Sequence, residues 1–216
     1  MNDGVAGGSA RREHERRRAR DEAKTRERWG RLGGVAVALS TEKQSTRAWS
    51  TGAVGEEHVG RTLESVASPD VRVLHDRRIP GSRANIDHIV VTAGGVLVID
   101  AKRYVDKRPS LRVTGGLFSP RRETLLVGGR EQTKLVDGML RQVALVAAEV
   151  PDVPARGYLC FVESDWPLIG GEFTINGIEV LWPRLLKKRV LAASNQGVGV
   201  DVTAVADALA RRFRSA

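Results

Sequence analysis

Two short apolar runs that also carry ionisable side chains constrain the fold of this chain more than any other feature. Residues 86–91 and 96–102 are each about as long as one strand and are rich in Val and Ile. The four residues between them, Thr92-Ala93-Gly94-Gly95, are typical of a turn. The pattern predicts a β-hairpin in which charged groups occur on otherwise apolar strands.

The register of this hairpin determines which charged groups meet. If Val91 pairs with Val96, Asp87 lies directly opposite Asp100. Opposed Cβ atoms in an antiparallel pair are roughly 5 Å apart, and two like charges at that separation repel each other unless a cation lies nearby. Lys102 follows Asp100 by two residues, so it projects from the same face of its strand. We therefore expect Asp87, Asp100 and Lys102 to converge on one site.

Paired carboxylates suit a hard cation such as Mg²⁺ or Mn²⁺, which retains water and takes further ligands from substrate phosphates. That chemistry favours a phosphodiester substrate. Taken alone, an Asp-x-Lys triplet such as Asp100-Ala101-Lys102 occurs often by chance, and it then forms a salt bridge at the end of a strand while Asp87 caps a turn. Its position after two buried strands favours the metal site.

Three ordered motifs resemble the nuclease-related domain (NERD) family of the PD-(D/E)XK nuclease superfamily. They are residues 52–56 at the start of an expected helix, residues 85–91 and residues 95–102, and the similarity extends from about Gly52 to Val150. The Pro-Asp that gives the superfamily its name is Ile86-Asp87 here, as in the NERD family. The resemblance implies an α/β, restriction-endonuclease-like αβββαβ core, with a mixed central sheet flanked by helices, and a nuclease activity.

The resemblance also implies roles for individual residues. Glu56, Asp87, Asp100 and Lys102 match the catalytic positions. Asp87, Asp100 and Glu56 are expected to hold Mg²⁺ or Mn²⁺, directly or through water, while Lys102 assists the attacking water. Gln142 resembles a glutamine that recurs in the family, where it would orient a water or a phosphate oxygen.

Periodicity in the expected helix gives Glu56 separate support. Val59, Leu63 and Val66 form its apolar stripe, and Glu56 precedes Val59 by three residues, which places it near the buried side. The alternative is that Glu56 is a first-turn acid, favoured there by the helix dipole.

The same order of elements follows from periodicity further along the chain. Helical spacing predicts a helix over about 131–150 that ends at Pro151, and residues 157–162 then form a strand parallel to its neighbour. Residues 111–114 and 125–127 are predicted to be short strands around an exposed loop at 119–122 whose arginines flank the site. The segment 173–182, a helix from about residue 183 and an amphipathic helix over 202–213 complete the domain.

Charge favours a polyanionic partner, since the net charge is +9 and the pI is near 10.4. Between Arg11 and Arg31, ten Lys or Arg residues stand against five Asp or Glu residues, with too few apolar residues to bury a core. We predict a basic extension over residues 1–50, helical or disordered, followed by a nuclease-related domain over 51–216. The extension either contacts phosphates without sequence preference or only increases solubility.

A single cysteine, Cys160, lies in an apolar run, which fits a small buried side chain and a reducing, cytoplasmic setting. We expect a nucleic-acid partner, with DNA favoured, and no integral membrane segment. The predicted activity is that of a metal-dependent endo- or exodeoxyribonuclease. The alternatives are a non-catalytic nucleic-acid-binding module and an interaction protein whose basic excess only maintains solubility.

Overall fold

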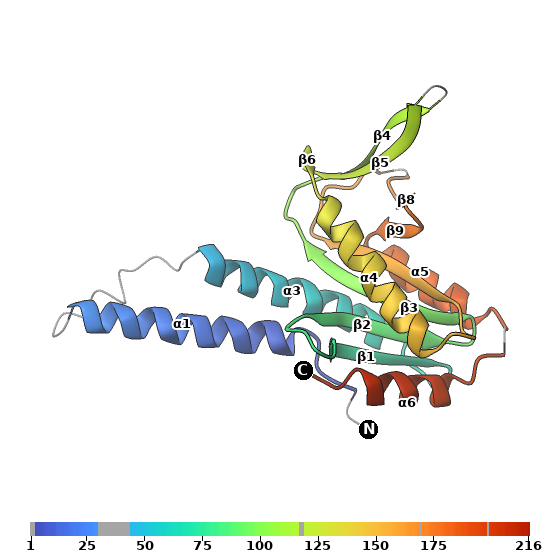
Figure 1. Ribbon diagram of the computed structural model, residues 1–216, viewed down its shortest axis with the longest axis horizontal. Coiled ribbons are helices and arrows are strands. Elements are labelled where there is room, and N and C mark those ends of the chain that lie inside the picture. Colours follow the sequence, from blue (N-terminus) through green and yellow to red (C-terminus); the bar gives the residue numbers. More distant parts are fainter. Residues whose placement is uncertain (1–2, 30–43, 117–118, 169, 198) are drawn as a thin grey trace.

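The computed structural model describes residues 3–29, 44–116, 119–168, 170–197 and 199–216 (Figure 1). In chain order the elements are α1 (Gly8–Trp29), α3 (Gln44–Glu64), β1 (Val71–Arg78), β2 (Asn85–Thr92), β3 (Gly95–Arg103), β4 (Pro109–Gly116), β5 (Ser119–Val127), β6 (Arg130–Glu131), α4 (Thr133–Glu149), β7 (Ala155–Val162), β8 (Phe173–Ile175), β9 (Ile178–Leu181), α5 (Pro183–Ser194) and α6 (Val202–Arg212).

A mixed six-stranded sheet forms the centre of the molecule, in the order β1-β2-β3-β7-β9-β8. The first three strands are antiparallel neighbours, whereas β7 is parallel to both β3 and β9. The crossover from β3 through α4 to β7 is therefore the predicted parallel connection. The order α3-β1-β2-β3-α4-β7 confirms the expected αβββαβ core, which is consistent with a restriction-endonuclease-like fold.

Helices cover both faces of the sheet and divide the core into two layers. Helices α4 and α6 pack on the face that carries Val96 and Val98 of β3. Helices α3 and α5 pack on the opposite face, which carries Leu97 and Ile99. This division follows from the alternation of side chains along a strand that is buried on both sides.

The β2–β3 hairpin has the predicted register, because Val91 pairs with Val96 and the ladder continues to His88 and Ile99. The turn is shorter than expected. Thr92 and Gly95 already pair across the strands, and the Thr92 hydroxyl donates a hydrogen bond to the Gly95 carbonyl at 3.0 Å. The turn proper is therefore the two residues 93 and 94, a length that suits a tight hairpin.

Helix α3 begins earlier than the sequence suggested. It starts at Gln44 rather than near Gly52, so Glu56 lies in the helix interior and is not a first-turn acid. Gly55 allows this helix to approach β3 closely, since a Cβ at Gly55 would lie 3.1 Å from the Cβ of Arg103. The helix continues through its glycines because tertiary contacts with the sheet outweigh their weak helix propensity.

The remaining long helices lie where periodicity placed them. Helix α4 spans Thr133–Glu149 and ends before Pro151, α5 begins at Pro183, and α6 covers Val202–Arg212. Cys160 is fully buried in β7, as a small apolar side chain would be.

A second sheet projects from the core as an arm (Figure 1). Strands β4 and β5 pair out to Gly116 and Ser119, and β6 pairs with the inner end of β5. The prediction of a loop over residues 119–122 is wrong, because Arg122 pairs with Thr114 inside the β5 strand. The inner end of the ribbon is buried at Leu125 and Val127, whereas its outer part extends into solvent through backbone hydrogen bonds alone. No hydrophobic alternation therefore marks the outer part in the sequence.

The basic N-terminal segment forms helix α1, and the chain before it lies along β1. The Asp3 carbonyl accepts the His75 amide at 2.7 Å, and the Asp3 carboxylate accepts a hydrogen bond from Arg72 at 3.2 Å. Residues 30–43 of the predicted extension lie outside the described residues. Among the helices that the structure describes, none is long and apolar enough to cross a membrane.

Candidate functional site

The predicted acidic residues lie where the apolar rows of β2 and β3 end. Asp100 and Lys102 continue the row of Val96 and Val98 on β3. On β2 the alternation is interrupted at Asp87, because Ile86 and Ile89 pack in the same core layer. Asp100 is 7% exposed, whereas Asp87 and Lys102 are partly exposed. Three ionisable groups therefore lie together where the apolar parts of the two strands end.

Asp87 lies just beyond the end of the hairpin ladder, so it is not a ladder partner of Asp100. Its Oδ2 accepts a hydrogen bond from the Ala101 amide at 2.9 Å. In a continued antiparallel ladder that amide would face the backbone of Ile86. The carboxylate of Asp87 thus replaces a backbone acceptor, and this contact fixes its side chain beside β3.

Lys102 is held by Asp100 through an ion pair between Nζ and Oδ1. Burial alone would lower the pKa of Lys102, but the negative charges of Asp100 and Asp87 outweigh it and raise the pKa above its ordinary value. Lys102 is therefore a fixed positive charge over the whole physiological pH range.

Glu56 reaches the same cluster from α3 and has an unusual proton affinity. Burial, followed by the negative charge of Asp76, raises the pKa of Glu56 to about 7; Lys102 opposes the rise, and Asp100 adds to it. The pKa of Asp87 is also raised well above its ordinary value, first by burial and then by the charge of Glu56. Burial and the neighbouring negative charges therefore both favour the protonated forms of Glu56 and Asp87.

Asp76 is a fourth acidic residue at the cluster that we did not predict from the sequence. The register between β1 and β2, in which His75 faces His88 and Arg77 faces Ile86, places Asp76 level with Asp87. Asp76 has a positive φ of 50° and is 2% exposed. The sequence signal was weak, since β1 itself ends in charged residues and is not typical of a buried strand.

The Asp76 carboxylate joins the cluster to the N-terminal helix. Its two oxygens accept hydrogen bonds from the Ser9 amide and hydroxyl, each at 2.6 Å, and Asn85 Nδ2 donates to it at 3.0 Å. Ser9 lies in the first turn of α1, where a negative charge is favoured by the free amides and the helix dipole. Asp76 thus fixes α1 beside the candidate site.

Gln142 lies on the α4 helix, over the sheet face that carries Val96 and Val98. Its Oε1 atom is buried without a hydrogen-bond partner among the described residues. An unpaired buried amide oxygen is costly, so a bound water or substrate group at this atom would be favourable. Its role as an orienting residue stays a prediction.

Two histidines occupy the opposite face of the hairpin. The Nδ1 atoms of His75 and His88 are 2.8 Å apart, and His75 Nε2 lies 2.6 Å from Glu64 Oε1. Burial, and then the neighbouring His75, lower the pKa of His88 well below its ordinary value. The lowered pKa favours the neutral form of His88, which is fully buried beside His75.

The acidic cluster has oxygen donors of the kind that could hold a magnesium or manganese ion. Within the described ranges, no three His, Cys, Asp or Glu side chains are already arranged to hold a metal ion together. A hard cation does not need such a cage, because Mg²⁺ commonly binds through one or two carboxylates and keeps several waters. Burial raises the pKa values of Glu56 and Asp87, and repulsion between the carboxylates adds to the rise; a cation would relieve that repulsion, so the donor set fits.

Comparison with protein families places this site in a known context. The family model described as the nuclease-related domain matches residues 51–162, from α3 through β7, and so includes Glu56, Asp87, Asp100, Lys102 and Gln142. Comparisons with curated proteins and with solved structures gave no significant match. The matched region covers more than half of the chain and contains the whole αβββαβ core. The chain therefore belongs to the nuclease-related domain (NERD) family.

Proposed function

We propose that this chain is a metal-dependent nuclease that hydrolyses phosphodiester bonds in DNA. The observation that carries the proposal is the juxtaposition of Asp87, Asp100 and Glu56 with Lys102 at one end of the β2–β3 hairpin. Mutually repelling carboxylates beside a permanent cation are suited to bind a divalent ion and an anionic substrate together.

Asp87 and Asp100 would hold the ion, and Glu56 would contact it directly or through a water. The bound cation would polarise the scissile phosphate and lower the pKa of a bound water. Lys102 would place its ammonium group beside the phosphoryl oxygens or the attacking water. The hydrogen bond from the Ala101 amide keeps Asp87 in place before any ligand arrives.

The direct test is cleavage of labelled linear, nicked and single-stranded DNA in the presence of Mg²⁺ or Mn²⁺. Wild-type protein is compared with Asp100→Asn and Lys102→Ala. We expect each change to reduce cleavage by at least about a hundredfold, the usual effect of removing a group that stabilises transition-state charge. The lengths of the labelled products would then distinguish cleavage within a strand from cleavage at its ends.

A charge-matched control is available on the same domain. Asp165 forms an exposed ion pair with Arg108 at 2.8 Å, and Asp165→Asn removes one negative charge without changing any of the candidate residues. This variant should cleave like wild type. If Asp100→Asn cleaves as fast as Asp165→Asn, the site assignment is wrong.

One observation favours the second candidate function, a non-catalytic nucleic-acid-binding module. Lys102 is already paired with Asp100, and an ion pair of this kind is also found at purely structural positions. A binding module predicts that wild-type protein leaves every DNA substrate intact with either metal, yet binds it with an affinity that falls steeply as salt rises.

A further inference from the structure

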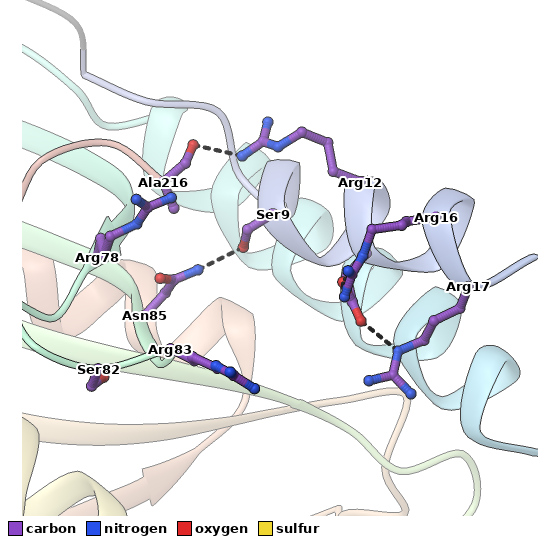
Figure 2. Close-up of a pocket in the computed structure, with 10 residues that line it drawn as sticks. Ser9, Arg12, Arg16, Arg17, Arg78, Ser82, Arg83, Asn85 and Ala216 are labelled. Carbon is purple, nitrogen blue, oxygen red and sulfur yellow. Dashed lines mark hydrogen bonds and ion pairs between the residues drawn. The ribbon is translucent and has the colours of Figure 1, made fainter. Parts of the chain in front are cut away.

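We propose that an arginine-lined cleft between α1, the connection from β1 to β2, and the C-terminal segment binds the phosphate backbone of the nucleic acid that enters the candidate site. The proposal rests on the proposed function, from which we take nucleic acid as the polyanion that is bound. Figure 2 shows the cleft, with side chains from α1 on one side and from residues 78–85 on the other.

The composition of the cleft is strongly basic. Its volume is 570 Å³, and five of the ten residues that line it are arginines, against a single acidic residue. The arginines come from two parts of the chain that are distant in sequence: Arg12, Arg16 and Arg17 from α1, and Arg78 and Arg83 from β1 and the β1–β2 connection. Facing guanidinium groups of this number attract an anion rather than an apolar ligand.

The single acidic residue, Glu13, organises the arginines but does not neutralise them. Its carboxylate pairs with Arg16 at 2.6 Å and with Arg17 at 2.6 Å, so one negative charge is shared by two cations. Arg12 donates a hydrogen bond to the carbonyl of Ala216 at 2.5 Å, which fixes it toward the C-terminal segment (Figure 2). The three arginines of α1 are therefore held in place before an anion arrives.

The basic surface continues beyond this cleft. Arg78 also lines an adjoining cleft together with Arg211, Arg212 and Arg214 of the C-terminal segment. A continuous arginine surface matches a polymer with repeating phosphates better than a small anion, which needs only one pocket.

The cleft adjoins the candidate site through β2. Asn85 lines the cleft and precedes Asp87 by two residues, so both side chains project from the same face of the strand. Asn85 Nδ2 donates to the Ser9 hydroxyl at 2.8 Å and to Asp76, which also raises the pKa of Glu56. A phosphate backbone lying in the cleft would thus lead directly to the carboxylates.

This surface is not implied by membership of the family. Helix α1 and the C-terminal segment both lie outside residues 51–162. The cleft forms only because α1 docks through Ser9 and Asp76 against Arg78, Arg83 and Asn85 of the matched domain.

The test is DNA binding without metal, measured by fluorescence anisotropy in EDTA over a series of salt concentrations. The cleft variant is Arg16→Gln/Arg83→Gln, which removes one arginine from each side of the cleft. The control is Arg18→Gln/Arg20→Gln, on the same helix but outside the cleft lining, with the same change in charge. Arg18 pairs with Glu22 at 3.0 Å, so each variant also loses one ion pair to a glutamate.

We expect the cleft variant to lower the slope of log Kd against log salt by about 1.8 for duplex DNA, since each lost phosphate contact removes about 0.9. Its Kd at low salt should rise at least about fivefold, whereas the control should change by less than about twofold. Circular dichroism and thermal unfolding of both variants establish that they are folded.

Two results would overturn the inference. Equal losses in the cleft and control variants would mean that net charge alone attracts DNA. Binding of labelled poly-glutamate that shows the same dependence on Arg16 and Arg83 as DNA would mean that the cleft selects acidic peptides instead. Because the assay contains no divalent metal, absence of cleavage in the separate nuclease test would refute the proposed activity and leave this result unchanged.

Discussion

The replacement Glu56→Gln should make the protein more stable at alkaline pH, relative to wild type, than at acidic pH. The pKa of Glu56 is raised from 4.5 to about 7 in the folded chain. As pH rises from 4.5 to 7, the unfolded chain releases this proton while the folded chain retains it, so the free energy of unfolding decreases. Glutamine does not titrate, and the decrease should be absent in the variant.

The magnitude follows from the size of the pKa change. Each tenfold change in an acid dissociation constant is worth about 1.4 kcal/mol, so the full effect would be roughly 3 kcal/mol. Glu56 is partly exposed, and screening by solvent reduces this to about 1–2 kcal/mol. The loss of its charge also lowers the pKa of Asp87, which acts in the same direction.

The assay is urea unfolding in EDTA, followed by tryptophan fluorescence at about pH 4.5 and about pH 8. Glu57→Gln is the matched control, because Glu57 is the neighbouring residue on α3 and pairs instead with Arg11. Wild type and Glu57→Gln should lose more stability between the two pH values than Glu56→Gln does. Equal losses in all three proteins would refute the electrostatic coupling described for this cluster.

Three further predictions address the metal, the core and the N-terminal helix. Mg²⁺ should raise the unfolding temperature more at about pH 8 than at about pH 5.5, because it binds ionised carboxylates. Asp100→Asn should abolish this increase. An increase that does not depend on pH would contradict binding at these carboxylates. Gly157→Ala should destabilise the fold by about 1–3 kcal/mol in urea unfolding, because the new Cβ would lie 2.6 Å from Ile178 Cδ1. Gly138→Ala, where the new Cβ would have no neighbour nearer than 4.0 Å, should instead stabilise α4. Similar effects at both positions would exclude the packing explanation. Asp76→Asn should increase amide hydrogen exchange in the first turn of α1, and unchanged protection would show that the carboxylate does not hold the helix.

Periodicity and turn chemistry were sufficient to predict most of the core. The β2–β3 register followed from two apolar runs and a glycine turn, and α4 followed from seven apolar positions at helical spacing before Pro151. Such patterns determine structure locally, because a shift of one residue would expose a complete apolar row. The same alternation placed Asp100 and Lys102 on one side of β3, whereas Asp87 lies beyond the ladder and reaches β3 through the Ala101 amide.

The features that were missed depend on contacts between distant segments. Strand β1 carries His75, Asp76 and Arg77 in a row, and their burial requires partners from β2, α1 and α3 that local patterns do not reveal. The length of the β4–β5 arm depends on pairing between two exposed strands. The division into residues 1–50 and 51–216 stays a prediction, although α3 is continuous across it.

The position of Asp76 gives the protein a reciprocal thermodynamic link between its N-terminal helix and its acidic cluster. The same carboxylate accepts the first-turn groups of α1 and raises the pKa of Glu56. Arg12 of docked α1 lies 3.7 Å from the Asp76 carboxylate and offsets part of its charge. This contact favours ionised Glu56, and ionisation of Glu56 favours the contact to the same extent. A cation at the carboxylates and a polyanion on α1 would therefore each increase the affinity for the other, across a single buried side chain.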